Sequence, residues 1–258
     1  MPIDNTFRPK VLVENTAVEA MELAAELFKS AVCQAVSDRH VCNIALAGGT
    51  TPHALYHQLA ETGASGDMPW ADVEIYFGDE RDVPHDNVES NYHMVQTTML
   101  DHVPVAPDRI HPMPADVGDL DAAAAQYESI IRRNIPAGPG SPPRFDVILL
   151  GMGADGHAAS LFPGMDALDE TDKLVTACFV PVLGRYRMTF TFPLINAAHT
   201  VLLLVTGADK AEAVATLLGD DTAGRGRLPA ARICPRGSYV MVLDTPAARL
   251  TSLKAQLK

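Results

Sequence analysis

Cysteine is scarce in this chain, and long apolar runs are missing. The four cysteines are Cys33, Cys42, Cys178 and Cys234. They form no C-x-x-C pair, and their spacing suits neither a zinc site nor a disulfide framework, so the scattered thiols indicate a reducing compartment. The longest apolar stretches, near 145–150 and 200–205, fall far short of the roughly 20 residues that a membrane helix needs. The first residues lack the continuous apolar segment of a secretory signal. We therefore expect a cytoplasmic protein with no membrane partner.

Positive charge is also sparse. Lys and Arg number 20 against 32 Asp and Glu, which gives a formal net charge of -12, and no basic run is present. Proteins that bind nucleic acid cluster Lys and Arg to displace counterions from the phosphates, so we expect no nucleic-acid partner. An anionic metabolite remains compatible with this charge. A few cationic groups in one cleft outweigh a diffuse surface charge that salt screens over about 8 Å.

Several signatures of catalysis and metal binding are missing. The nine histidines show no metal spacing such as H-E-x-x-H. No G-x-S-x-G serine-hydrolase elbow occurs, and no lysine follows Gly48 and Gly49 as it would in a nucleotide-binding P-loop. These absences exclude common metalloprotease, serine-hydrolase and nucleotide-binding designs.

What is present is a regular alternation of apolar strands and amphipathic helices. Strands are expected near 10–14, 41–47, 72–77, 144–150, 173–180, 186–192, 200–207 and 238–243, and helices near 16–37, 52–61, 90–100, 119–134 and 208–219. Thr16 with Glu19 forms a capping box, Thr51 is expected to cap the second helix, and Ser90 with Asn91 is expected to cap the third. The pattern predicts an α/β fold with a mostly parallel, Rossmann-like sheet and helices on both faces. We expect one domain over 1–258.

Ligands of open α/β sheets bind beyond the carboxyl ends of the strands, where two loops suit a phosphorylated ligand. The segment "AGGTTP" (47–52) leads into a helix N-terminus, whose free N–H groups and positive dipole attract phosphate or carboxylate. In "GDER" (78–81), Arg81 suits bidentate contact with a phosphate, while Asp79 suits sugar hydroxyls. Taken singly, each loop is equally compatible with a plain glycine turn or a surface ion-pair cluster.

A third loop, "GMGADGHAASLFPG" (151–164), contains the G-x-G-x-x-G pattern of a dinucleotide-binding turn. Only six residues, 157–162, separate the last glycine from Pro163, and proline is strongly disfavoured in a helix interior. That length is too short for a helix that docks on a pyrophosphate. The glycines then serve a sharp exit from the strand, with Asp155 suited to an Asx turn. The turn presents His157, the side chain type best able to exchange a proton near neutral pH.

The three loops together carry a family resemblance. The segments "GGTTP", "DERDVPHDNVESNY" and "LLGMGADGHAASLFPG", with "RMTFTFPLINAA", "GADKAEAV" and "LPAARI" further on, resemble the 6-phosphogluconolactonase family over roughly residues 10–250. This resemblance implies the fold shared with glucosamine-6-phosphate deaminases and ribose-5-phosphate isomerases. It also implies hydrolysis of 6-phospho-D-glucono-1,5-lactone to 6-phosphogluconate in the oxidative pentose phosphate pathway, without metal or other cofactor.

The resemblance also implies roles for individual residues. The position of His157 matches the general acid/base of the family, and Asp155 or Asp79 is expected to orient the imidazole or the sugar. Phosphorylated substrate is expected to be surrounded by Gly48, Gly49, Thr50, Thr51, Arg81, Arg187 and Lys210. Backbone N–H groups of the 151–156 turn are expected to stabilise the oxyanion.

Two other functions stay open at this point. An amino-sugar phosphate deaminase of the same fold carries a glutamate five residues after the shared histidine, where this chain has Phe162. A non-catalytic sugar-phosphate sensor would bring a DNA-binding helix-turn-helix, for which the chain has neither room nor basic surface. The oligomeric state is expected to be a monomer or a small homo-oligomer.

Overall fold

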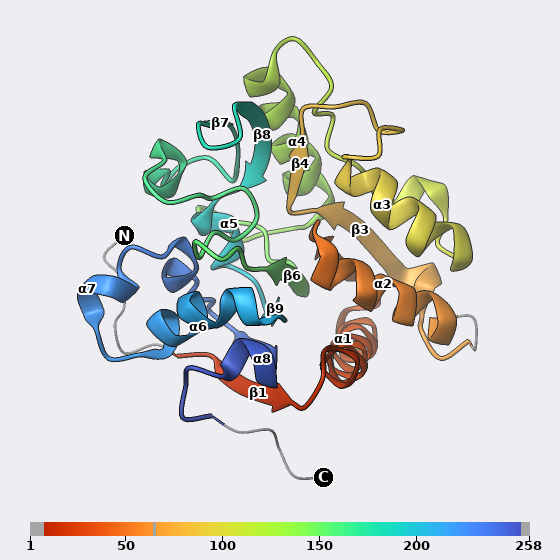
Figure 1. The fold of residues 1–258 in the computed structure, drawn as a ribbon. Helices are drawn as coiled ribbons and strands as arrows, with labels where there is room; N and C mark the ends of the chain where they lie inside the picture. The colour runs from red at the N-terminus through yellow and green to blue at the C-terminus, as the bar shows by residue number, and fades with distance from the viewer. Residues whose placement is uncertain (1–7, 64–65, 254–258) are drawn as a thin grey trace.

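Seven parallel strands form the main sheet of the computed structural model, which describes residues 8–63 and 66–253 (Figure 1). In order across the sheet they are β1 (Lys10–Glu14), β10 (Ser238–Asp244), β9 (Thr200–Val205), β6 (Val147–Gly151), β2 (Cys42–Leu46), β3 (Val73–Phe77) and β5 (Ile110–His111). The predicted mostly parallel α/β sheet is confirmed. The prediction of one domain over 1–258 extends over 1–7, 64–65 and 254–258, which lie outside the described residues, and it stays a prediction.

The sheet is covered on both faces. All five residues of β2 are buried, as are five of the six in β9. Successive side chains of a strand point to opposite faces, so such continuous burial requires packing on each side. The longer helices are α1 (Ala17–Arg39), α2 (Thr50–Gly63), α3 (Asn91–Thr98), α4 (Leu120–Asn134) and α6 (Ala211–Leu218). α1 packs against α2, and α2 packs against α3, so that these helices follow one another around the right-hand flank in Figure 1.

Most predicted helix starts are confirmed, and one is wrong. Thr16 and Glu19 form the expected capping box, and the Ser90 side chain accepts a hydrogen bond from the His93 N–H at the start of α3. α2, however, begins at Thr50, so Thr51 lies inside the helix and does not cap it. Its hydroxyl lies 2.9 Å from the Thr206 hydroxyl instead. Pro52 is tolerated because N–H groups of the first turn have no partner within a helix.

A second, smaller sheet adds what the alternating pattern did not predict. The expected strands near 173–180 and 186–192 exist as β7 (Val175–Val180) and β8 (Arg185–Phe190), but they lie outside the main sheet. With β4 (Asp79–Arg81) they form a three-stranded antiparallel sheet in the order β4-β8-β7. Only Gly78 separates β3 from β4, and its carbonyl accepts a hydrogen bond from the Phe190 N–H. The acidic and basic residues after β3 therefore lie in a paired strand and not in a free loop.

No helix within residues 8–63 and 66–253 combines the length and the apolar character that a membrane-spanning helix requires.

Candidate active site

A cleft of about 310 Å³ lies at the carboxyl ends of β2, β3, β6 and β9. Every residue predicted from sequence for the site, except Asp155, lines this cleft: Gly48, Gly49, Thr50, Thr51, Asp79, Arg81, His157, Arg187 and Lys210. Met152, Ser160, Phe162 and Leu183 also contribute to its wall. The parallel topology explains the convergence, because it brings the carboxyl ends of neighbouring strands to one edge of the sheet.

The phosphate-suited end of the cleft is the start of α2. Because α2 begins at Thr50, the first N–H groups of a 14-residue helix and the positive end of its dipole lie at the cleft. Lys210 contributes from the turn after β9, where its ammonium lies 3.0 Å from Asp209. This end of the cleft therefore combines backbone donors with a positive charge.

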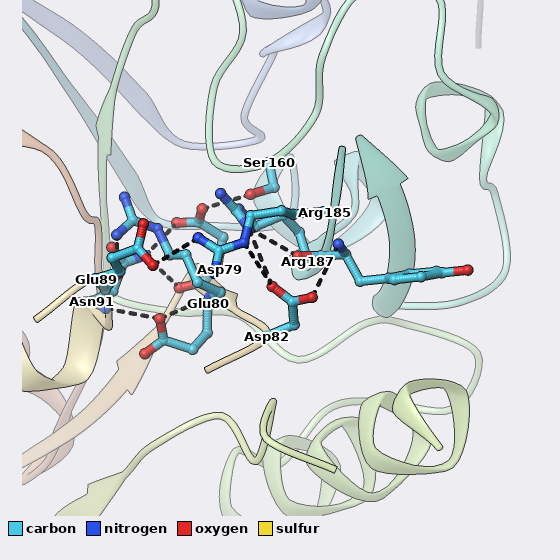
Figure 2. Close-up of polar contacts among 10 residues, drawn as sticks. Asp79, Glu80, Asp82, Glu89, Asn91, Ser160, Arg185 and Arg187 are labelled. Atoms are coloured by element: carbon cyan, nitrogen blue, oxygen red, sulfur yellow. Dashed lines mark hydrogen bonds and ion pairs between the residues drawn. The ribbon is translucent and has the colours of Figure 1, made fainter. Parts of the chain in front are cut away.

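Two arginines face the same cleft from the small sheet. Arg81 of β4 and Arg187 of β8 are directly opposite each other in the antiparallel pairing. Arg187 is only 8% exposed, and burial together with the neighbouring Arg81 charge lowers its pKa. Its guanidinium lies 3.6 Å from Asp82, and both residues are labelled in Figure 2. Like charges opposite each other on a sheet repel, so a dianionic ligand at this place would relieve an unfavourable interaction.

His157 is held by a carboxylate on its own turn. Its Nδ1 lies 2.6 Å from Asp155 Oδ1, and its backbone N–H donates to the same oxygen at 3.1 Å. A Cβ on Gly153 would overlap the His157 ring, and Gly156 adopts a φ of +78°. The glycines are therefore needed for close approach of the imidazole and for a left-handed turn, and not for a cofactor.

The contact with His157 favours the ionised form of Asp155. Partial burial opposes ionisation of Asp155, but the hydrogen bond and the charge of His157 outweigh it, so the pKa of Asp155 lies below its ordinary value. An ionised Asp155 accepts a hydrogen bond from Nδ1–H, which leaves Nε2 as the nitrogen that can take a proton from another group. Of the two carboxylates expected to orient the imidazole, the structure places Asp155 on the ring.

Phe162 covers one face of the same imidazole. The two rings stack with their centroids 4.0 Å apart and their planes at 24°. Sequence reasoning noted Phe162 only for what it replaces in the deaminases and missed this contact. The stack restricts the rotation of the ring and keeps water off one of its faces.

The expected oxyanion donors are only partly available. The Gly153 N–H donates to the His157 carbonyl at 2.9 Å, and the Gly156 N–H donates to the Gly153 carbonyl at 3.0 Å. Both groups are thus occupied inside the turn. The prediction that the glycine turn stabilises an oxyanion is wrong for these two residues, because the turn needs their N–H groups for its own hydrogen bonds.

Asp79 lies in a buried polar cluster. It is 7% exposed, and Figure 2 shows it accepting from the Ser160 hydroxyl at 2.7 Å and from the Asn91 side chain at 3.2 Å. Sequence reasoning missed Ser160, and it treated Asn91 only as part of a helix cap. Ser160 lies three residues after His157, and Asn91 lies directly after Ser90. Their places in loops that were expected to converge are the one sign in the sequence that they lie near Asp79.

Within residues 8–63 and 66–253, no set of three or more His, Cys, Asp or Glu side chains is arranged to hold a metal ion.

Fold and site together define an α/β protein with a cationic cleft and a histidine–aspartate pair at the carboxyl edge of its sheet. A sequence profile described as "Glucosamine-6-phosphate isomerases/6-phosphogluconolactonase" matches residues 15–242. The chain belongs to this family.

Relatives within the family differ in how far they resemble the chain. A 6-phosphogluconolactonase of Synechocystis sp. is 38% identical over 245 residues, which cover 95% of this chain and 96% of the relative. The solved 6-phosphogluconolactonase of Trypanosoma brucei superposes with a TM-score of 0.82 at 29% identity, covering 95% of this chain and 99% of that one. A solved monomeric glucosamine-6-phosphate deaminase has a TM-score of 0.79 at 21% identity, over 94% and 100% of the two chains, and shows the shared fold alone.

The lowered pKa of Asp155 predicts a pH-dependent contribution to stability. A carboxylate with a depressed pKa stabilises the folded state fully above its ordinary pKa of about 4, and this contribution is lost as the pH falls through the depressed value. Asp155→Asn should therefore lower the free energy of unfolding at neutral pH, with the deficit disappearing under acidic conditions. Denaturant unfolding of both proteins across the pH range measures this difference.

Asp166→Asn is the matched control, since Asp166 is exposed on a neighbouring segment. A deficit of Asp155→Asn that is equal at neutral and acidic pH would contradict the assignment of the effect to the ionised carboxylate.

Proposed function

We propose that the chain hydrolyses 6-phospho-D-glucono-1,5-lactone to 6-phospho-D-gluconate, the second step of the oxidative pentose phosphate pathway. The observation that carries this proposal is the single cleft in which His157, paired with Asp155, faces Arg81, Arg187 and the start of α2. A base and a phosphate-suited cationic end in one cleft are the two groups that a phosphorylated lactone requires. The 6-phosphogluconolactonases among the relatives support the same substrate.

The reaction needs one proton acceptor that later becomes a proton donor. In the proposed mechanism, Nε2 of His157 takes a proton from water as the water oxygen attacks C1 of the lactone. Asp155 holds the imidazole through Nδ1 and stabilises the imidazolium that forms. The tetrahedral intermediate then collapses, the bond between C1 and the ring oxygen breaks, and the imidazolium returns its proton to that oxygen. The products are the free carboxylic acid and the sugar hydroxyl.

The remaining site residues bind the substrate in this proposal. The backbone N–H groups of Gly48, Gly49, Thr50 and Thr51, with Arg81, Arg187 and Lys210, hold the phosphate end. Asp79 accepts hydrogen bonds from sugar hydroxyls in this proposal, since it lines the cleft and its carboxylate has acceptor sites beyond those that Ser160 and Asn91 occupy. Hydrolysis by this route uses no metal or other cofactor.

The contact between Phe162 and His157 argues against the deaminase alternative. Ring opening of an amino sugar requires an acid near the ring oxygen, and the side chain stacked on His157 is a phenyl ring with no ionisable proton to donate. A sensor function would retain sugar-phosphate binding without turnover, and the same assay separates it from the lactonase.

Location and assembly complete the proposal. None of the four cysteines forms a disulfide in the described part of the chain, which supports a reducing compartment such as the cytoplasm. A monomer or a small homo-oligomer, with no nucleic-acid or membrane partner, is the state in which we propose that the chain acts.

The proposed function is tested with freshly generated 6-phosphogluconolactone. Acid release is followed above the spontaneous rate, and ammonia release from glucosamine 6-phosphate is followed in parallel. Accelerated lactone opening without ammonia release supports the lactonase. Ammonia release indicates a deaminase, and binding of 6-phosphogluconate without turnover of either compound indicates a sensor; either result overturns the proposal.

Replacement of His157 tests the assigned base. His157→Ala should lower kcat by about 10²- to 10⁴-fold, the usual contribution of a general acid/base, while binding of 6-phosphogluconate changes little. His53→Ala, on the exposed side of α2, is the control and should leave kcat unchanged. Near-normal turnover by His157→Ala would refute the role of the histidine.

Replacement of Arg187 tests the phosphate end. Arg187→Met keeps the apolar stem and removes the charge, so KM for the phosphorylated lactone should rise about 10- to 100-fold, the equivalent of one charged hydrogen bond. The kcat/KM for unphosphorylated glucono-1,5-lactone should be nearly unaffected, which serves as the internal control. An equal loss for both lactones would assign Arg187 to the fold or to the sugar instead of the phosphate.

A further inference from the structure

Asn91 is buried between two parts of the cleft wall without lining the cleft itself. It is the first residue of α3 and is 1% exposed. Its Nδ2 donates to the Asp79 carbonyl at 2.8 Å and to Asp79 Oδ1 at 3.2 Å, and Figure 2 shows both residues in the polar cluster. The carboxamide therefore binds the backbone and the side chain of the same residue, which restricts how Asp79 can turn.

The other end of the same carboxamide lies against Gly48. The three heavy atoms nearest to an ideal Cβ on Gly48 are all from the Asn91 side chain, and Oδ1 is the closest. Gly48 does not have a positive φ, so its backbone conformation would accept alanine. The need for glycine at this position thus comes from the close approach of Asn91 and not from the turn.

Asn91 Oδ1 is buried and has no hydrogen-bond partner in the described structure. Such groups are rare and costly in proteins, so this oxygen calls for an explanation. The position that a Cβ on Gly48 would take lies next to this oxygen, so the Gly48 Cα–H on that side is directed toward Oδ1, as in a weak C–H···O contact. Oδ1 of Asn91 therefore packs closely against Gly48, at the start of the loop that suits a phosphate.

A buried carboxylate holds Asn91 in this position. Glu80 is fully buried, and it accepts hydrogen bonds from the backbone N–H groups of Asn91 at 2.7 Å and Tyr92 at 2.9 Å, and from the Ser90 hydroxyl at 3.0 Å. It thereby fastens the first turn of α3 to β4, the strand that also carries Asp79. Glu80 thus fixes the backbone of Asn91 through hydrogen bonds to Asn91 itself and to the residues before and after it.

We propose that Asn91 is a positioning residue that couples two parts of the cleft. These are Asp79, which is assigned to the sugar hydroxyls, and the loop at Gly48, which is assigned to the phosphate. One carboxamide orients Asp79 through Nδ2 and supports Gly48 through Oδ1, so the distance between the two ends is determined by a single rigid side chain. The proposal rests on the proposed lactonase function for its kinetic readout. Misplacement of a substrate-binding group by about 1 Å can cost 10²-fold in rate, which sets the expected scale.

Asn91→Asp tests the first contact because it replaces a donor by an acceptor at equal size. At alkaline pH a second carboxylate beside Asp79 removes the hydrogen bond and adds repulsion, so kcat should fall about 100-fold relative to wild type. As the pH falls, one proton is shared by the two carboxylates and restores a donor, so the ratio of variant to wild-type kcat should rise. A ratio that is independent of pH would overturn the orienting contact.

Asn87→Asp is the matched control for that variant. It makes the same chemical change four residues earlier. The new carboxylate can still accept the hydrogen bond that the Glu89 N–H donates to Asn87 Oδ1. Its kcat should equal that of wild type across the pH range. Thermal unfolding of all three proteins at each pH separates a lost contact from a lost fold.

A double-mutant cycle tests the second contact without relying on Asn91→Asp. Gly48→Ala should weaken binding of inorganic phosphate strongly in wild type, about tenfold or more, because the new Cβ displaces either Asn91 or the loop. In the Asn91→Ala background the same Gly48→Ala change should cost little, since the space is then empty. Calorimetric titration with phosphate measures both losses, and equal losses in the two backgrounds would refute the coupling.

The two tests also separate this inference from the proposed function. If the wild type does not open the lactone, the lactonase proposal fails, while the phosphate-binding cycle still decides whether Asn91 supports Gly48. If the wild type is active and the cycle shows additive losses, the lactonase stands and the positioning role of Asn91 fails.

Discussion

The parallel pairing of β2 with β3 and β6, and of β6 with β9, is the constraint on which the rest of the structure depends. Parallel strands cannot be joined by a tight turn, so the chain has to return across the sheet between them, mostly as a helix. Each return begins at the same edge of the sheet. Loops that lie far apart in the sequence, such as those at Gly48 and His157, therefore meet in one cleft, and each is followed by a return crossing that holds it in place.

Within that cleft, a protein of strongly negative net charge maintains a locally positive site. Arg81 and Arg187 lie opposite each other across two strands, and α2 points its N-terminus to the same space. The surrounding carboxylates are mostly engaged: Asp155 with the imidazole, Glu80 with the start of α3, and Asp79 with Ser160 and Asn91. Hydrogen bonds from neutral donors fix the orientation of Glu80 and Asp79 without cancelling their charge. The positive character of the site therefore comes from the gathering of Arg81, Arg187, Lys210 and the start of α2 around one cleft.

Two glycines of the site serve close contact between neighbouring groups. Gly153 leaves room for the His157 ring, and Gly48 leaves room for the Asn91 carboxamide. In each case a polar side chain, from the same turn for Gly153 and from α3 for Gly48, fills the space that a Cβ would take. The close approach at Gly153 and the positive φ of Gly156 account for two glycines of the pattern that imitates a dinucleotide-binding turn.

Much of the fold and the composition of the site followed from the sequence alone. Strand and helix positions, the parallel sheet, the cap at Ser90 and the convergence of the three loops depend on local periodicity and on the rule that strand ends converge, and both can be read from residue order. Arg187 and Lys210 were expected in the cleft only because the family resemblance implies them. The start of α2 at Thr50, the separate sheet of β4, β7 and β8, and the contacts of Asn91, Ser160 and Phe162 could not be read in this way. They depend on which segments pack together across long stretches of chain. Residue types and spacing thus determined which groups the cleft contains. Tertiary packing decided that Asp155 and not Asp79 holds the imidazole, and that Gly48 and Asp79 share one supporting side chain. Such contacts depend on distances between elements, which local sequence does not encode.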